Sequence, residues 1–163
     1  MRILGLDPGT VIIGFGVVDG DIDKMSLVDC GVIMCDAGTP IPERLYHLYS
    51  ELSRIVELYR PEAAAIEQPF VAKNARSALA IGKAQAVCIL AAANRGIPVY
   101  DYAPRQVKLA VSGYGASSKE QVQEMVKLQL GLDAAPQPAD ASDALAVAIC
   151  HLGQAHVQGL LAR

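Results

Sequence analysis

The chain has 163 residues, a net charge of −3 at pH 7 and 52% hydrophobic residues, a composition typical of a globular protein with a substantial core. We therefore expect residues 1–163 to form a single domain. No apolar run approaches the roughly 20 residues that span a bilayer, and the early Asp7 argues against a signal peptide. A cytoplasmic protein without membrane contact is expected. The four cysteines lack C-x-x-C spacing, which favours reduced core thiols over disulfides or a zinc site.

Charge is distributed unevenly along the chain. Residues 1–69 carry a net charge of −6, residues 70–130 carry +5, and the remainder carries −2. A basic segment of this kind can form a phosphate-binding face on an otherwise acidic protein. An ordinary solvated surface is the alternative interpretation.

The first third of the chain has the pattern of β-strands. Three runs rich in β-branched and apolar residues, Arg2–Asp7, Ile12–Val18 and Leu27–Cys35, are separated by short turns. The first turn is Asp7-Pro-Gly-Thr10, a strong turn signal. These features predict an antiparallel meander.

The pattern then changes to alternating helices and strands. Leucine and isoleucine recur at helical spacing in the segment from Pro42 to Tyr59, which predicts an amphipathic helix. The further predicted elements are a strand at Ala63–Glu67, a helix at Ala75–Asn94, a strand at Val99–Tyr102, a helix at Ser117–Leu130 and a helix at Asp140–Ile149. An antiparallel meander followed by βαβ units predicts an α/β fold: a five-stranded mixed sheet with helices on both faces.

Four carboxylates stand at the ends of these predicted buried elements. Asp7 and Glu67 each close a strand, and Asp140 and Asp143 open the last helix on one of its faces, at i and i+3. A carboxylate beside an apolar core is costly unless it is paired, hydrogen-bonded or bound to a cation. If the fold brings the four together, a divalent ion would relieve their repulsion. The pattern predicts a metal-dependent phosphotransfer or nuclease site.

Each of these acids also has a purely structural interpretation. Asp7 suits the first position of a type I turn, and Glu67 could simply end a strand. Asp140 and Asp143 suit a helix N-terminus. Other catalytic patterns are weak, because the sequence has neither a Walker-type glycine loop nor a Ser-His-Asp arrangement.

Magnesium is the ion that this set of ligands suits best. Mg²⁺ prefers hard oxygen ligands and keeps several waters. Two such ions can activate a water and stabilise a leaving 3′ oxygen in an in-line displacement. We expect all four acids to serve two Mg²⁺ ions, for which Mn²⁺ could substitute.

Several ordered motifs resemble the RuvC family of Holliday-junction resolvases over nearly the whole chain. They are Ile3–Thr10 with Gly14–Val17, Ala65–Asn74, Ser77–Leu79, Arg105–Lys108 and Ala139–Ala146. The resemblance implies an RNase H-like fold and a homodimer. It also implies Mg²⁺-dependent, paired symmetric nicking of four-way DNA junctions in recombination and repair. The expected products are 5′-phosphate and 3′-hydroxyl ends, and the expected partners are the RuvA and RuvB branch-migration proteins.

The resemblance also assigns roles to individual residues. The family's catalytic acids fall on the four carboxylates, although its third acid position can also be His. Its junction-facing aromatic residue falls on Phe70, for which a core position is the alternative, and its basic residues near the scissile phosphate fall on Lys108 and Lys119. Further predicted DNA contacts from the basic segment are Lys73, Asn74, Arg76, Lys83 and Arg105.

Three different functions share parts of this pattern. Asp7-Pro-Gly-Thr10 followed by Gly14-Phe-Gly-Val17 resembles the first phosphate loop of actin-like and sugar-kinase-like ATP-binding proteins. Those proteins need two such domains, and this chain is long enough for one. The second function is that of a related nuclease acting on structured RNA, and the third is that of a junction-binding module without cleavage. The small residues of Ala75–Asn94 would allow close approach of a second chain.

Overall fold

The computed structural model describes residues 1–68 and 75–162. Phe70, Lys73 and Asn74 lie outside these ranges. The strands are β1 (Arg2–Asp7), β2 (Ile12–Gly20), β3 (Met25–Met34), β4 (Ala63–Glu67) and β5 (Val99–Tyr102). Within the described ranges, the helices are α1 (Ile41–Tyr59), α2 (Ala75–Ala93), α3 (Pro104–Ser112), α4 (Lys119–Gln129) and α5 (Ala139–Leu161).

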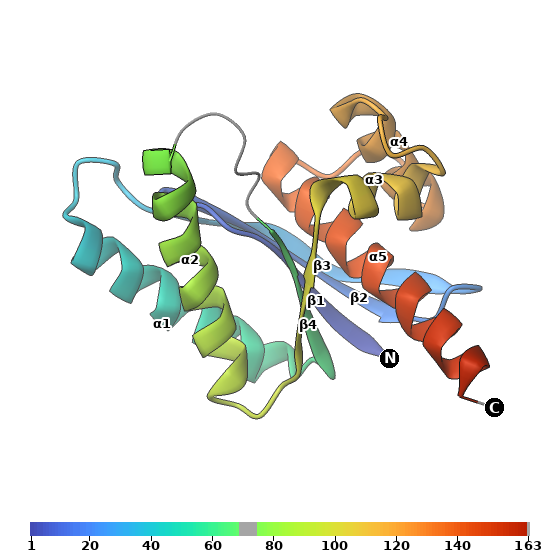
Figure 1. Ribbon diagram of the computed structural model, residues 1–163, viewed down its shortest axis with the longest axis horizontal. Coiled ribbons are helices and arrows are strands. Elements are labelled where there is room, and N and C mark those ends of the chain that lie inside the picture. The colour runs from blue at the N-terminus through green and yellow to red at the C-terminus, as the bar shows by residue number, and fades with distance from the viewer. Residues whose placement is uncertain (69–74, 163) are drawn as a thin grey trace.

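The strands form one mixed sheet in the order β3-β2-β1-β4-β5 (Figure 1). β1 pairs antiparallel with β2, and β2 pairs antiparallel with β3. β4 pairs parallel with β1 on one side and with β5 on the other. The sheet therefore combines the predicted meander with parallel strands, and the predicted fold class is confirmed. β3 begins at Met25, two residues before the predicted start.

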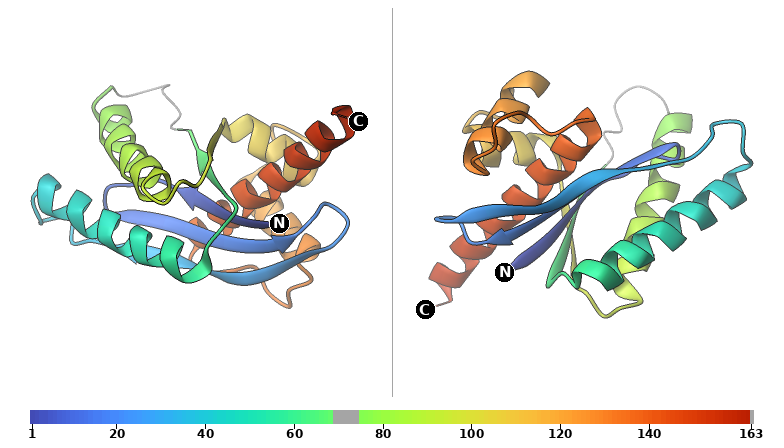
Figure 2. Two further views of the ribbon diagram at one scale, coloured as in Figure 1. Left: turned by 90° about the horizontal axis from the view of Figure 1, so that it is seen from below. Right: turned by 180° about the vertical axis from the view of Figure 1, so that it is seen from behind.

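Helices α1 and α2 cover one face of this sheet (Figure 2). Leu48, Leu52 and Val56 of α1 are buried there against strand residues of β1, β2 and β4. The sequence pattern placed Leu58 on this apolar face, but its side chain is 71% exposed. Val56 takes the inward position instead, because it follows Leu52 by one helical turn.

The other face is covered by α3, α4 and α5, with α5 lying directly across the sheet (Figures 1 and 2). The first half of α5 is buried almost all round, which explains its alanine-rich sequence. The helix continues to Leu161, well beyond the predicted end at Ile149. Helices α2 and α5 are long and apolar enough to cross a membrane by length and composition alone. In α5, burial against the sheet accounts for the apolar composition.

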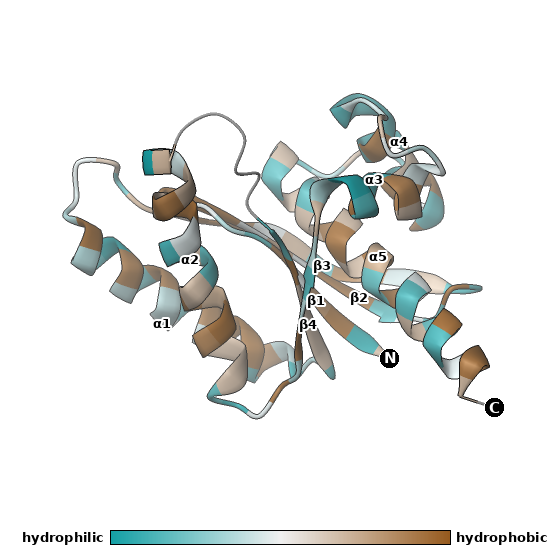
Figure 3. Cartoon of the chain, in the orientation of Figure 1, coloured by the Kyte–Doolittle hydropathy of each residue, from teal (hydrophilic) through white to brown (hydrophobic). Residues whose placement is uncertain are grey.

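Helix α3 was not predicted. Val107 and Val111, one turn apart, are its buried residues, so the apolar periodicity that would indicate a helix extends over only two positions. The remainder of this nine-residue helix is polar or partly exposed, as the alternating colours of α3 in Figure 3 show. Gly113, with φ of 75°, ends the helix in the left-handed conformation that glycine adopts readily.

Glycines on β1 and β2 let α5 lie unusually close to the sheet. A Cβ atom on Gly14 would overlap the carbonyl oxygen of Asp140, and one on Gly5 would overlap that of Ala144. Gly14 and Gly5 are buried. The backbone of α5 thus rests on the strand backbones, which fixes where its first turn stands relative to the end of β1.

Candidate active site

The strand ends and the first turn of α5 meet at one edge of the sheet. The parallel register of β1 and β4 pairs Leu6 with Ile66, so Asp7 and Glu67 follow at neighbouring positions on adjacent strands. On the other side, Asp7 is paired with Gly14, on which the Asp140 backbone rests. The fold therefore brings acids that are far apart in sequence to the same edge.

Asp7 has the most perturbed carboxyl group of the set. Its burial, followed by the charges of Glu67, Asp143 and Asp140, raises its pKa to about 8, and Lys119 opposes the shift. Near neutral pH this carboxyl group therefore holds a proton for much of the time in the metal-free protein. A bound cation would release that proton, because it stabilises the ionised form.

Glu67 and Asp143 are perturbed in the same direction. Burial and then the charge of Asp143 raise the pKa of Glu67, while a hydrogen bond from the protonated carboxyl of Asp7 lowers it. Burial also raises the pKa of Asp143, against the opposing hydrogen bond from Lys119. Burial destabilises the ionised forms of all three acids, so a bound cation would stabilise this cluster strongly.

Lys119 supplies one positive charge at this edge. Its Nζ lies 2.6 Å from Oδ2 of Asp143. Lys119 is the first residue of α4, directly after Ser118, whose hydroxyl accepts a hydrogen bond from the Gln121 N–H. The Ser118 cap fixes the start of the helix and hence the direction from which the lysine reaches the acids.

A cavity of about 190 Å³ opens between the strand ends and the three helices of this layer. Glu67 and Asp143 line it together with Lys108 and Lys119. The remaining walls are apolar or small and come from Pro104, Val107, Val122 and Ala146. The cavity therefore joins carboxylates and ammonium groups on a partly apolar floor, an arrangement that can hold a metal ion and a phosphate side by side.

The donor set fits divalent magnesium or manganese. Every candidate ligand is a carboxylate oxygen, which suits a hard cation. In the described part of the chain, no three acidic, histidine or cysteine side chains already stand in the geometry of a metal cage. The ion pair with Lys119 explains this in part, because it holds the Asp143 carboxylate on the ammonium group.

The other predicted DNA contacts divide between the two layers. Arg105 and Lys108 lie on α3, on the same face of the sheet as the acids. Arg76 and Lys83 are exposed on α2, which packs on the opposite face (Figure 1). Arg76 stands in the first turn of α2, whereas Lys83 lies two turns further along.

Sequence reasoning missed two contributors to this edge. Gly14 allows the close approach of α5, and its signal is the alternation of glycines in Gly14-Phe-Gly, which by itself indicates only resemblances to the RuvC family and to the phosphate loop of actin-like proteins. Val107 forms part of the cavity wall, but its helix, α3, was itself not predicted. Both become recognisable only when the packing of α5 and α3 is known.

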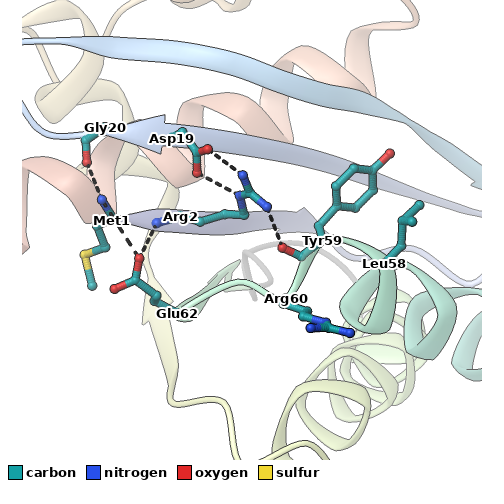
Figure 4. Close-up of a pocket in the computed structure, with 8 residues that line it drawn as sticks. All are labelled: Met1, Arg2, Asp19, Gly20, Leu58, Tyr59, Arg60 and Glu62. Carbon is teal, nitrogen blue, oxygen red and sulfur yellow. Dashed lines mark hydrogen bonds and ion pairs between the residues drawn. The ribbon is translucent and has the colours of Figure 1, made fainter.

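A wider hollow, of about 690 Å³, lies at the opposite end of β1 (Figure 4). There Arg2 binds Asp19 through two nitrogens and donates a third hydrogen bond to the Tyr59 carbonyl. The N-terminal ammonium of Met1 donates to the Gly20 carbonyl oxygen at 3.0 Å. These contacts fasten the first strand to its neighbours, so the polar groups of this hollow are largely used within the fold.

A mixed sheet of this order, with acids at the ends of β1 and β4 and on the helix that crosses the sheet, defines an RNase H-like protein with an acidic site. The chain belongs to the family described as crossover junction endodeoxyribonuclease RuvC, whose sequence model matches residues 3–151. RuvC of Dehalococcoides mccartyi (strain ATCC BAA-2266) is 54% identical over 93% of this chain and 92% of its own. The Thermus thermophilus RuvC bound to a Holliday junction substrate superposes with a TM-score of 0.88, at 34% identity and 96% coverage of both chains.

The likeness of fold extends to a more distant protein. The yeast mitochondrial Holliday junction resolvase Ydc2 has a TM-score of 0.69 at 15% identity and covers 97% of this chain and 82% of its own. With the family established over residues 3–151, the interpretation as an actin-like or sugar-kinase-like ATP-binding domain is set aside.

Proposed function

We propose that this enzyme, a crossover junction endodeoxyribonuclease, cuts four-way DNA junctions at the edge formed by Asp7, Glu67, Asp140 and Asp143. The observation that carries the proposal is the clustering of acids with raised pKa values beside two lysines, in a chain of the RuvC family. Membership of that family implies dependence on a divalent metal. We further propose two Mg²⁺ ions, with Mn²⁺ as a substitute, held by the four carboxylates.

The residues of the chain have separable roles in this proposal. When bound, the metal ions would supply a nucleophilic water and stabilise the leaving 3′ oxygen, giving 5′-phosphate and 3′-hydroxyl ends. Asp7 would bind these cations as an ionised carboxylate, and its proton would pass to solvent when they bind. Lys119 can leave Asp143 for the scissile phosphate, and Lys108 on the cavity wall can hold a neighbouring non-bridging oxygen.

The proposal is tested by incubating a synthetic four-way junction with the protein and Mg²⁺ or Mn²⁺. Wild-type protein should give paired nicks at symmetric positions near the crossover, with little cutting of linear duplex or structured RNA. Asp7→Asn should lower the cleavage rate at least about a hundredfold, because it removes a charged ligand at the reacting centre, while junction binding is retained. Asp133→Asn, an exposed acid in the loop after α4, is the matched control and should cleave normally. Unchanged nicking by Asp7→Asn would refute the assignment of the site.

Symmetric nicking of two strands calls for two active sites, and we propose a homodimer. One face of α2 supports this. Leu79 and Leu90, 71% and 53% exposed, lie on the same side of the helix as exposed Ala86. Large apolar side chains displayed at helical spacing beside a small residue suit packing against a second copy of the same helix.

The remaining expectations concern context. RuvA and RuvB are the proposed partners, and the cytoplasm is the proposed compartment, because the proposed substrate is a DNA junction. Phe70 is proposed to stack on a base near the crossover, with Lys73 and Asn74 beside it. Arg76, Lys83 and Arg105 are proposed to contact the phosphates of the junction arms.

A further inference from the structure

The turn between α3 and α4 presents an aromatic ring to solvent. Tyr114 is 66% exposed, and it stands between Gly113 and Gly115. A single exposed tyrosine is common on protein surfaces, so the meaning of this ring depends on how its turn is held and on the charges around it.

The backbone of this turn is held firmly although the ring is exposed. The Tyr114 carbonyl oxygen accepts a hydrogen bond from the Ser117 N–H at 3.1 Å and another from the Ser117 hydroxyl at 2.8 Å. Ser117 is only 4% exposed. The hydroxyl of Ser112, the last residue of α3, lies 2.8 Å from the Ser117 hydroxyl, which links the end of the helix to the turn. The ring therefore projects from a preorganised turn, which lowers the conformational entropy lost when the ring binds a ligand.

The stretch of chain that contains the turn is basic. Residues 104–119 contain three cations, Arg105, Lys108 and Lys119, and no acid. Arg105 lies against the turn itself, because a Cβ on Gly115 would approach its Cγ to 3.0 Å and its Nε to 3.2 Å. Lys108 and Lys119, at the two sides of the turn, line the cavity of the candidate active site. An exposed aromatic ring among cations fits a nucleic-acid strand, since bases stack on the ring while phosphates meet the cations.

We propose that Tyr114 stacks on an unpaired nucleobase of the bound junction, next to the strand whose phosphate enters the cavity. The proposal rests on the proposed function for its ligand. It adds a second aromatic contact to the one proposed for Phe70, and Tyr114 lies in the layer formed by α3, α4 and α5. It predicts that the ring contributes to the preference for junctions over duplex DNA. In a linear duplex the bases are already stacked on one another and leave no free face for the ring.

Affinity measurements test the role of the ring. Binding of a fluorescent four-way junction is followed by anisotropy in EDTA, which prevents cleavage. Tyr114→Ala should weaken junction binding by about tenfold, and Tyr114→Phe, which keeps the flat ring, should stay within about twofold. Tyr46→Ala on α1, where the wild-type ring is 72% exposed on the other layer, is the matched control and should be unchanged. A Tyr114→Ala variant that binds within twofold of wild type overturns the proposal.

A spectroscopic test reports the stacking itself. The chain contains no tryptophan, so Tyr114→Trp introduces a single tryptophan whose emission can be excited apart from that of the tyrosines, and Tyr46→Trp provides the control. Junction binding should quench the emission at position 114 strongly and leave that at position 46 unchanged. Absence of quenching, or equal quenching by a linear duplex of the same sequence, overturns the stacking contact.

These outcomes are distinguishable from failure of the proposed function. If wild-type protein shows no preference for the junction over duplex, the proposed function fails first. If wild-type protein prefers the junction and the variants at position 114 behave like wild type, only the inference about Tyr114 fails. Unchanged thermal unfolding of Tyr114→Ala shows that a loss of binding does not come from misfolding.

Discussion

Lys119 occupies a position that the helix alone would disfavour. A cation at the first residue of α4 meets the positive end of the helix dipole, which costs a few tenths of a kcal/mol. Its contact with Asp143 offsets that cost and, with the more distant acids, raises the pKa of the lysine. The charge of Lys119 is therefore matched to the acids at the ends of β1 and β4 rather than to its own helix.

The raised pKa of Asp7 predicts a pH-dependent stability in metal-free buffer. The folded protein favours the protonated carboxyl, with a pKa of about 8, whereas the unfolded chain has the ordinary value near 3.8. The stabilising contribution is thus fully present below about pH 4 and is lost as pH rises to about 8.

The Asp7→Asn variant tests this pH dependence. Its side chain stays neutral, so the variant should show a flatter dependence of unfolding free energy on pH and be more stable than wild type at pH 8 by about 1–3 kcal/mol. Urea unfolding from pH 5 to 9 measures it, with Asp133→Asn as control. A wild-type slope that Asp7→Asn leaves unaltered would contradict the pKa assignment.

At the scale of elements, the contact between α5 and the sheet depends on glycine. Gly14→Ala would force its methyl group against the Asp140 carbonyl oxygen, which neither backbone can easily avoid. We expect a loss of about 1–3 kcal/mol in the free energy of unfolding and a disproportionate loss of cleavage, because the first turn of α5 must move. Gly159→Ala, where a methyl group would meet nothing within 4 Å, is the control and should be neutral or slightly stabilising. Full activity of Gly14→Ala would show that the acids tolerate displacement of α5.

A buried hydrogen bond ties α5 to the edge strand β5. The Tyr102 hydroxyl lies 2.7 Å from Nδ1 of His151, which is 3% exposed. Nε2 of this histidine has no partner within the described structure, and burial lowers its pKa, so the ring is neutral near pH 7. Tyr102 is paired with Glu67, so the bond joins the helix that carries Asp143 to the strand beside Glu67.

Removing that hydroxyl should weaken the fold measurably. Tyr102→Phe removes the hydrogen-bond partner of the Nδ1 atom of His151 and should lower the free energy of unfolding by about 1–3 kcal/mol. Tyr100→Phe is the comparison, because Tyr100 contacts the same imidazole through its ring, with centroids 4.5 Å apart, and that contact is kept. Chemical denaturation of the two variants side by side gives the result. Equal stabilities would mean that the hydroxyl of Tyr102 adds nothing.

The elements that the sequence predicted well are those with a dominant local signal. The strands ending at Asp7 and Glu67 are bounded by turn residues and filled with buried apolar side chains, so their ends were predicted to the residue. Helix α3 carries its signal in only two valines and was missed. The distal part of α5 is exposed, so it lacks the apolar pattern that marks the first half. The convergence of Asp140 with Asp7 depends on the backbone contact at Gly14, which no local pattern encodes.

At the scale of the whole molecule, the exposed leucines of α2 predict self-association. Leu90→Glu combined with Leu79→Glu would place charges in the proposed interface and should give a monomer by analytical ultracentrifugation. The monomer should keep its fold and lose paired nicking, because each junction needs two sites. Leu160→Glu, on the exposed end of α5, is the control and should leave the association state unchanged. A double variant that sediments like wild type would place the interface elsewhere.

The close seating of α5 on β1 and β2 has a consequence for motion. Separating Asp140 and Asp143 from Asp7 would require the helix to lift from the centre of the sheet, where both cores meet. Because such a movement would expose much of the core, we expect amide exchange near Ala144 to be among the slowest in the protein. The enzyme can then adapt to a distorted DNA substrate only through its surrounding helices and turns. If the four acids are the active site, we expect the DNA junction rather than the acidic cluster to change shape when the complex forms.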